Sequence, residues 1–115
     1  MFYILCTALF YIENTDNIEM GIISGLNKEF ESRVRLGMMS VLMVNDWMDF
    51  TEMKNLLQVT DGNLSSHATA LEKSGYIEVK KEFVGKRPRT SYKITDSGKK
   101  AFQEHLAFLE KMMRQ

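Results

Sequence analysis

Residues 60–75 read TDGNLSSHATALEKSG, and this stretch has the pattern of a short helix with a defined start and stop. The hydroxyl of Thr60 can accept a hydrogen bond from a free N–H group of the first turn, and Asp61 places a negative charge at the positive end of the helix dipole. Gly75 suits the left-handed residue that ends many helices. Apolar residues recur at i, i+4 and i+7 and define one buried stripe: Leu64, Ala68 and Leu71.

The outer face of this predicted helix carries short polar side chains near its N-terminus. They are Asn63, Ser66 and His67, with Ser65 close to the edge of the face. Such side chains donate and accept hydrogen bonds and let a helix approach another surface closely. A recognition helix that enters a DNA major groove needs this kind of face at this end. An ordinary amphipathic helix with a small polar face is the alternative.

Composition limits the classes of protein that the chain can belong to. A chain of 115 residues with 44% hydrophobic and 26% charged residues is typical of one globular domain. The net charge of zero argues against a uniformly basic nucleic-acid binder but permits a local basic patch. Cys6 is the single cysteine, so the sequence predicts no internal disulfide, no cysteine metal cluster and a reducing, cytoplasmic setting.

Residues 1–12, MFYILCTALFYI, form an apolar segment at the N-terminus. The segment is shorter than the roughly 20 apolar residues that span a bilayer, and it lacks the basic flank and cleavage site of a signal peptide. We expect it to cover part of the core or a subunit interface, or to derive from an upstream start codon. Residues 1–26 are therefore predicted to be an extension, and residues 27–115 the domain.

Between residues 27 and 44 the sequence predicts helical structure. Asn27 can cap a helix, and residues 28–44 read as one helix or two abutting ones with an apolar face. Four of the nine methionines cluster here and just beyond: Met38, Met39, Met43 and Met48. Methionine at helical spacing usually fills an irregular core, so we expect packing in preference to a ligand pocket.

A helix-turn-helix follows from the next residues. Residues 47–50 are predicted to form a short edge strand, and Thr51 is predicted to cap a helix over residues 52–57. Residues 58–60 then form a three-residue turn that leads into the helix after Thr60. A short helix, a tight turn and a capped second helix make a helix-turn-helix.

After Gly75 the period changes from helical to alternating, which predicts a β-hairpin. Ile77, Val79, Lys81 and Phe83 alternate with polar residues in a strand predicted to be half-buried. Residues 84–88 contain the only proline and read as a loop, and a returning strand starts near Arg89.

The hairpin is basic. Residues 80–93 contain six positive side chains and one negative one, a local balance of +5 that leaves −5 for the rest of the neutral chain. The cations are Lys80, Lys81, Lys86, Arg87, Arg89 and Lys93. A basic hairpin beside a helix-turn-helix is suited to contact phosphates or the minor groove. The alternative is a set of solvated charges that keep a sheet edge from aggregating.

A C-terminal helix is predicted from its cap at Thr95 to about Met113. Two adjacent apolar stripes run along it, and the predicted dimer contacts are Phe102, His105, Leu106, Leu109 and Met113. So wide an apolar surface exceeds what one small domain usually covers, which favours a partner helix in a homodimer. Packing against the N-terminal apolar segment is the competing interpretation, and both can hold in a dimer.

The order of these elements resembles the winged helix-turn-helix transcription regulators of the MarR and ArsR type. The strings DGNLSSH, LEKSGYIEV and FVGKRPRTSYKIT are similar to those of a compact group of small bacterial winged-helix regulators, and the resemblance covers residues 27–102. It implies a mainly α fold with a small β-hairpin (α+β), a homodimer, and double-stranded DNA as the partner. The DNA-binding residues that it implies are Thr60, Asp61, Asn63, Ser65, Ser66 and His67 on the recognition helix, and Lys86, Arg87, Arg89 and Thr90 on the wing.

Motifs for other chemistry are missing from the sequence. His67 and His105 have no Cys or carboxylate partners at ligand spacing, which argues against an ArsR-like metal site. The chain contains no phosphate loop, nucleophile elbow or HExxH string, so no enzyme, cofactor or metal site is predicted and no effector is identified. The remaining alternative is a winged-helix interaction module whose basic hairpin contacts an acidic protein.

Overall fold

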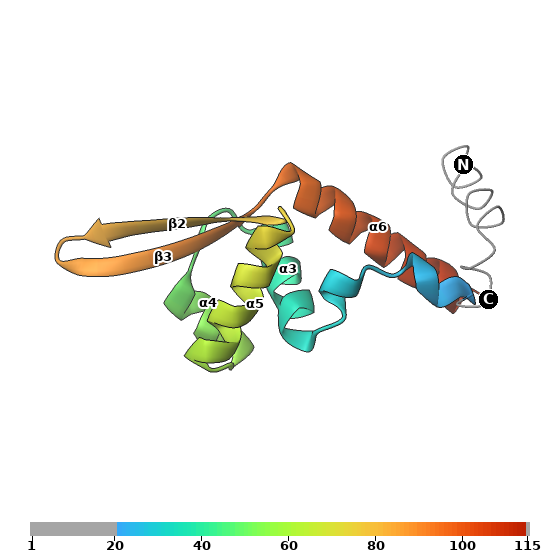
Figure 1. Ribbon diagram of the computed structural model, residues 1–115, viewed down its shortest axis with the longest axis horizontal. Coiled ribbons are helices and arrows are strands. Elements are labelled where there is room, and N and C mark those ends of the chain that lie inside the picture. Colours follow the sequence, from blue (N-terminus) through green and yellow to red (C-terminus); the bar gives the residue numbers. More distant parts are fainter. Residues whose placement is uncertain (1–20, 115) are drawn as a thin grey trace.

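A computed structural model of the protein describes residues 21–114 (Figure 1). Predictions for the apolar segment 1–12 and for Cys6 fall outside these residues. In chain order the elements are the 3-10 helices η1 (Gly21–Gly25) and η2 (Lys28–Phe30), helix α3 (Arg33–Val44), strand β1 (Met48–Asp49), helices α4 (Phe50–Leu57) and α5 (Asp61–Lys73), strands β2 (Ile77–Val84) and β3 (Arg87–Ile94), and helix α6 (Asp96–Met113).

The fold is the expected α+β winged helix. The three strands form one antiparallel sheet in the order β1-β3-β2, and helices α3, α4 and α5 pack together beside its base. The molecule measures 56 × 25 × 23 Å because two elements extend from the packed helices in opposite directions. Figure 1 shows the β2–β3 hairpin at one end and the C-terminal half of α6 at the other.

One hydrophobic core joins the helices to the base of the sheet. Of the four methionines predicted to pack, Met38 and Met39 are fully buried, and Met43 and Met48 are partly buried against the core, which confirms that methionine fills it. Met53 is also fully buried. The other buried apolar residues are Phe30, Leu42, Leu64, Ala68, Leu71, Ile77, Tyr92, Ile94 and Phe102. The stripe predicted for residues 60–75 is therefore the face of α5 that packs into this core.

Two of the predicted helix starts are confirmed by their caps. The hydroxyl of Thr60 accepts a hydrogen bond from the N–H group of Asn63, and that of Thr95 accepts one from Gly98. The helix after β1 starts earlier than predicted, because Asp49 caps α4 and accepts a hydrogen bond from the N–H group of Thr51. The predicted strand 47–50 is correspondingly shorter.

The predicted helical region 28–44 is two separate pieces. Asn27 caps η2 as predicted, and its side chain accepts a hydrogen bond from the N–H group of Glu29. Ser32 then starts α3 anew, since its hydroxyl accepts hydrogen bonds from the N–H groups of Val34 and Arg35. The second cap ends the first helix after one turn and sets the direction of α3.

The hairpin turn is tighter than the predicted loop 84–88. Only Gly85 and Lys86 link the strands, and Gly85 has a φ of 68°. A positive φ at the first central residue but not at the second, Lys86, is the pattern of a type II′ turn, which has glycine in the first position. Pro88 pairs with Phe83 inside the ladder, where the alternation of antiparallel pairs makes this a position without hydrogen bonds.

Most of the hairpin extends beyond the core, so the predicted half-buried strand is wrong for its outer half. Ile77 is buried, but the side chain of Phe83 is 75% exposed. Alternation gives the face on which a side chain lies, and within residues 21–114 no other element covers that face near the tip.

Within residues 21–114, no helix has the length and apolar character needed to cross a membrane.

Candidate nucleic-acid interface

The first two turns of α5 expose the small polar surface that the sequence predicts. Asn63, Ser65 and Ser66 are exposed, and so is Gly62 between them and the cap. A Cβ atom added to Gly62 would meet nothing within 4 Å, so this glycine has no packing role inside the described chain. The N-terminal surface of α5 is therefore open for a close approach by another molecule.

Thr60 and Asp61 are occupied in holding this helix in place. The Thr60 hydroxyl caps α5, and the carboxylate of Asp61 forms an ion pair with Lys54 of α4 at 2.9 Å. A carboxylate at this position also interacts favourably with the helix dipole. These two predicted site residues therefore support the angle between α4 and α5.

His67 lies on the flank of α5 that faces α3, and it is half-buried, unlike Ser65. Its Nδ1 atom accepts a hydrogen bond from Nε of Arg35 at 3.0 Å. The same guanidinium donates through Nη1 to Oε1 of Glu29 at 3.0 Å. His67 was predicted to lie on the outer face and Ser65 at its edge; in the structure, Ser65 is the more exposed of the two.

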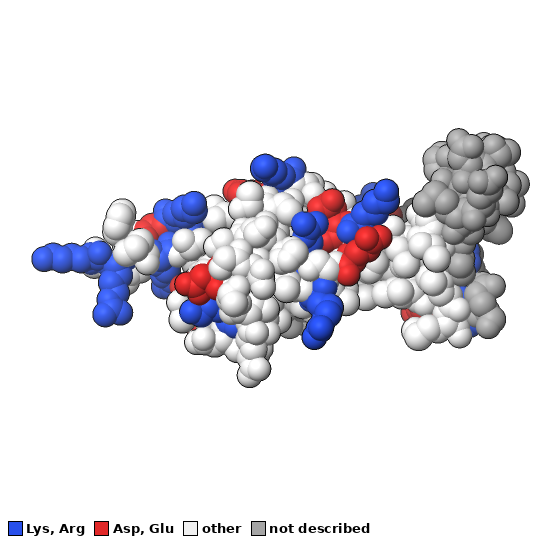
Figure 2. Space-filling view, turned by 60° about the horizontal axis from the view of Figure 1, so that its bottom comes forward, with Lys and Arg blue, Asp and Glu red and all other residues white. Residues whose placement is uncertain are grey.

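The positive charges of the hairpin divide into those with an acidic neighbour and those without one. Arg89 lies 3.4 Å from Asp49, Lys93 lies 3.5 Å from Asp46 and Lys80 lies 4.0 Å from Glu82. Within residues 21–114, the hairpin cations that form no ion pair are Lys81, Lys86 and Arg87. Figure 2 shows Lys and Arg side chains as the outermost groups at the hairpin end, whereas both signs are mixed over the middle of the molecule.

Each face of the hairpin has its own set of side chains. The register pairs Lys81 with Thr90 and Phe83 with Pro88 on the face that continues from the core, and Glu82 with Arg89 and Val84 with Arg87 on the other. Of the predicted wing residues, Lys86 and Arg87 are at the tip, whereas Arg89 and Thr90 lie closer to the base. The tip therefore combines free cations with an exposed aromatic ring.

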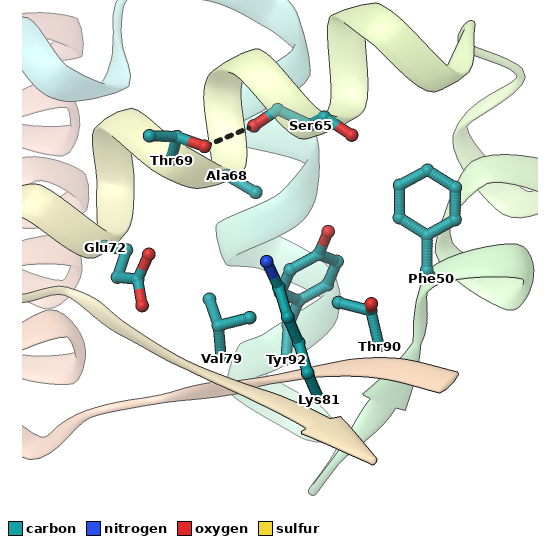
Figure 3. Close-up of a pocket in the computed structure, with 9 residues that line it drawn as sticks. All are labelled: Phe50, Ser65, Ala68, Thr69, Glu72, Val79, Lys81, Thr90 and Tyr92. Atoms are coloured by element: carbon teal, nitrogen blue, oxygen red, sulfur yellow. Dashed lines mark hydrogen bonds between the residues drawn. The ribbon is translucent and has the colours of Figure 1, made fainter. Parts of the chain in front are cut away.

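A groove separates α5 from the base of the hairpin (Figure 3). It has a volume of about 560 Å³ and is lined by Phe50, Ser65, Ala68, Thr69, Glu72, Val79, Lys81, Thr90 and Tyr92. Burial, and secondarily the nearby carboxylate of Glu72, raise the pKa of the Tyr92 hydroxyl, which is therefore neutral near pH 7. The predicted residues Ser65 and Thr90 lie on opposite walls, so the groove connects the helix surface to the wing.

Three residues that shape this surface were not predicted from the sequence. Arg35 orients His67, Lys54 pairs with Asp61, and Trp47 lies under the Nζ atom of Lys80 at 4.4 Å from the ring centre. All three precede α5 in the chain, so no local pattern connects them with the helix or the wing. The one available signal in the sequence was Trp47, which directly precedes a strand that pairs with the hairpin.

The predicted dimer residues of α6 separate into two groups. Phe102 and His105 are buried against Phe30, with ring centres 5.3 Å apart in each pair, and are therefore covered by the chain itself. Leu106 is 42% exposed and Met113 is 80% exposed. Leu109 is half-buried, so the apolar surface that remains exposed on α6 lies on its distal half.

His105 is bound by the segment that precedes η2. Its Nδ1 atom accepts a hydrogen bond from the backbone N–H group of Asn27 at 3.0 Å. Burial lowers the pKa of this imidazole, and the nearby Glu31 partly opposes that shift. Within residues 21–114, no group of three or more His, Cys, Asp or Glu side chains is placed to hold a metal ion.

Comparisons of the sequence and of the structure with known proteins agree with each other. Residues 34–113 match the model of a family described as a winged helix DNA-binding domain. An uncharacterized protein of Methanocaldococcus jannaschii is 37% identical over 79 residues, which cover 69% of this chain and 86% of that protein.

Solved structures agree with these matches. A transcriptional regulator homologue from Pyrococcus horikoshii OT3 superimposes with a TM-score of 0.69 at 32% identity, covering 75% of this chain and 85% of the other. The crystal structure of MarR superimposes with a TM-score of 0.66 at 18% identity, covering 93% and 76%. The MepR protein of S. aureus, solved as a DNA complex, has the same fold, with a TM-score of 0.58 at 16% identity and coverage of 96% and 86%.

Proposed function

This chain belongs to the family of winged helix DNA-binding domains, and on that premise we propose that it is a sequence-specific, homodimeric regulator of transcription. Helix α5 enters the major groove, and the hairpin contacts the phosphate backbone or the adjacent minor groove. The domain spans residues 27–115, with residues 1–26 as an extension. The protein acts in the cytoplasm and is not an enzyme.

The observation that carries this proposal is the joint position of two surfaces. Exposed small polar groups at the start of α5 lie across one groove from a hairpin whose tip cations, Lys86 and Arg87, have no acidic partner among residues 21–114. Hydrogen-bonding groups on a helix read base edges, and unpaired cations bind phosphates. DNA is the partner that offers both targets at once.

In the proposed complex, the predicted site residues have different tasks. Asn63, Ser65, Ser66 and His67 contact bases, whereas Thr60 and Asp61 fix the approach of the helix. Arg87 and Lys86 contact phosphates at the tip, while Arg89 and Thr90 support the base of the wing. The ion pair of Arg89 with Asp49 supports this division.

The dimer in this proposal forms through the distal half of α6. Leu106 and Met113, together with Ile23 of η1, which is 60% exposed, leave apolar area at the end of the molecule opposite the hairpin. Two copies joined there would direct two reading surfaces away from a two-fold axis, as an inverted-repeat site requires. Leu109 and the end of η1 complete this surface.

One experiment tests the proposal directly. The protein is incubated with a pool of random duplex DNA at two salt concentrations, and the retained DNA is sequenced. An enriched inverted repeat is the expected result, and it also gives the half-site spacing. Weak, salt-labile retention without an enriched sequence would contradict sequence-specific recognition.

A second candidate function is contact with an acidic protein through the hairpin tip. The exposed ring of Phe83 beside Lys86 and Arg87 favours it, since apolar and cationic groups together suit many protein interfaces. An interaction module of this kind would leave the random pool without an enriched sequence. The first experiment therefore separates the two functions.

A further inference from the structure

The contact between Arg35 and His67 has a consequence for which base α5 can read. Nε of Arg35 lies 3.0 Å from Nδ1 of His67, across the interface between α3 and α5. Glu29 holds the other side of the guanidinium through Nη1, also at 3.0 Å. With 23% of the arginine side chain exposed, this contact is partly shielded from water.

The hydrogen bond from Arg35 determines which nitrogen of the His67 imidazole carries the proton. A guanidinium donates and cannot accept, so Nδ1 of His67 must be unprotonated to accept from Arg35. The neutral ring then carries its proton on Nε2. Among residues 21–114, Nε2 has no hydrogen-bond partner, and it remains as a donor.

The half-buried ring of His67 borders the surface proposed to meet DNA. Asn63 is exposed one turn earlier on the same flank of α5, four residues before His67. In the major groove, guanine offers two acceptors, N7 and O6, whereas cytosine offers an amino donor. A group that can only donate therefore favours guanine and disfavours cytosine at the same position.

We infer that Arg35 is a positioning residue for DNA reading: it holds His67 as an Nε2–H donor, and His67 selects guanine over cytosine at one position of each half-site. The inference rests on the proposed function, because it requires α5 in the major groove. Arg35 itself contacts no base in this arrangement. It acts through the orientation and the protonation site of the imidazole.

Three variants separate this role from a structural one. H67N keeps an acceptor for Arg35 near the position of Nδ1 and removes the donor at the position of Nε2, because the amide NH2 group of asparagine lies closer to the backbone. R35M removes the donor to His67 but keeps a long side chain. R33M removes one positive charge from an exposed position two residues earlier on α3 and serves as the charge-matched control.

The measured quantity is a ratio of affinities. Each base pair of the half-site enriched from the random pool is inverted in turn, and binding of original and inverted duplexes is compared. For the wild type and R33M, inverting one G·C pair is expected to weaken binding roughly five- to tenfold through this contact. For H67N and R35M, the ratio at that pair falls to about one, while ratios at other pairs remain.

Nitrogen NMR of the histidine rings in the free protein gives an independent readout. The wild type and R33M are expected to show His67 with Nδ1 unprotonated and Nε2 protonated, and R35M to show a mixture of tautomers. A predominant Nδ1–H form in the wild type would overturn the inference without any DNA measurement.

Failure of this inference is distinguishable from failure of the proposed function. A wild-type protein that enriches a sequence, with the same preferences in H67N and R35M, would overturn the role of Arg35 and leave the regulator intact. A wild-type protein that enriches no sequence would overturn both.

Discussion

The imidazole of His105 and the backbone of Asn27 are joined by a hydrogen bond of 3.0 Å that ties α6 to the start of the domain. Asn27 makes two further contacts: its Nδ2 atom donates to the hydroxyl of Tyr76 at 3.0 Å, and its Oδ1 atom accepts from Glu29 at 2.8 Å. Asn27 therefore connects α6, the segment between α5 and β2, and η2.

The bond to His105 predicts that stability falls with acidification. Burial lowers the pKa of His105 in the folded chain below the value of about 6.5 expected in the unfolded chain, so the unfolded state binds more protons at low pH. The stabilisation is complete above pH 6.5 and is lost as the pH falls from there through the lower folded pKa. A protonated Nδ1 also cannot accept the bond from Asn27.

Thermal unfolding measured from pH 7.5 down to pH 5 checks this prediction. Tm of the wild type should fall over this range more than that of H105Q, which keeps an acceptor but does not titrate. Parallel curves for the two proteins would show that His105 is not the group responsible.

Replacing Gly98 by alanine is expected to cause a large loss of stability. A Cβ atom there would lie 2.1 Å from the backbone carbonyl oxygen of Tyr76, and the same oxygen accepts the N–H group of Thr95 at 3.0 Å. G98A must therefore move α6 away from the loop before β2. We expect a loss of about 2–4 kcal/mol in the free energy of unfolding, measured by urea titration, by analogy with overpacked sites.

Replacing Gly62 by alanine is expected to have opposite effects on stability and on DNA binding. An alanine methyl group there has open space, and alanine in place of glycine in a helix should add about 0.5–1 kcal/mol of stability. If DNA approaches the first turn of α5 closely, the same methyl group lowers affinity. G62A should raise Tm and weaken binding to the enriched duplex, and unchanged or tighter binding would place the first turn away from DNA.

Arg87 and Arg89 are expected to differ in the salt dependence of DNA binding. Arg87 forms no ion pair within residues 21–114, whereas Arg89 lies beside Asp49. Alanine at Arg87 should reduce the slope of log affinity against log salt by about 0.9, the value for one lost phosphate contact, and alanine at Arg89 should change it less. K100A, which removes an exposed charge from α6, is the control. A slope change for R89A as large as that for R87A would reverse this assignment.

Replacing Leu106 by glutamate is expected to change the oligomeric state. The residue is 42% exposed on the part of α6 proposed as the dimer surface, so a carboxylate there would be buried on association at a cost of several kcal/mol. Sedimentation equilibrium should give a dimer for the wild type and a shift towards monomer for L106E. L56E changes an equally apolar, 61% exposed residue on α4 and should remain dimeric. A dimeric L106E would move the interface elsewhere.

The features that the sequence predicts correctly depend on close neighbours in the chain. The caps at Thr60 and Thr95, the turn before α5 and the positive φ of Gly75 are determined within a few residues. Asp49 and Thr51 both have side chains that can cap a helix, and only the pairing of Met48 and Asp49 with β3 decides between them.

The features that could not be predicted depend on residues far apart. His67 and Arg35 are 32 positions apart, so no periodicity connects them, yet their contact decides how the histidine is presented. The burial of Phe102 and His105 likewise depends on Phe30, which lies more than 70 residues earlier. For Phe83, alternation gives the side of the strand but carries no information on whether another element covers it.

Because the turn at Gly85 and Lys86 has only two residues, the wing can be lengthened with its faces unchanged only by two residues per strand. Adding one residue to each strand moves the tip outward by about 3.4 Å and exchanges the faces on which all the tip side chains lie. Adding two residues to each strand restores the faces and extends the reach by about 7 Å, close to the spacing of two phosphates along one strand. Variation in wing length among related chains should therefore occur in pairs of residues per strand, with the glycine of the turn retained.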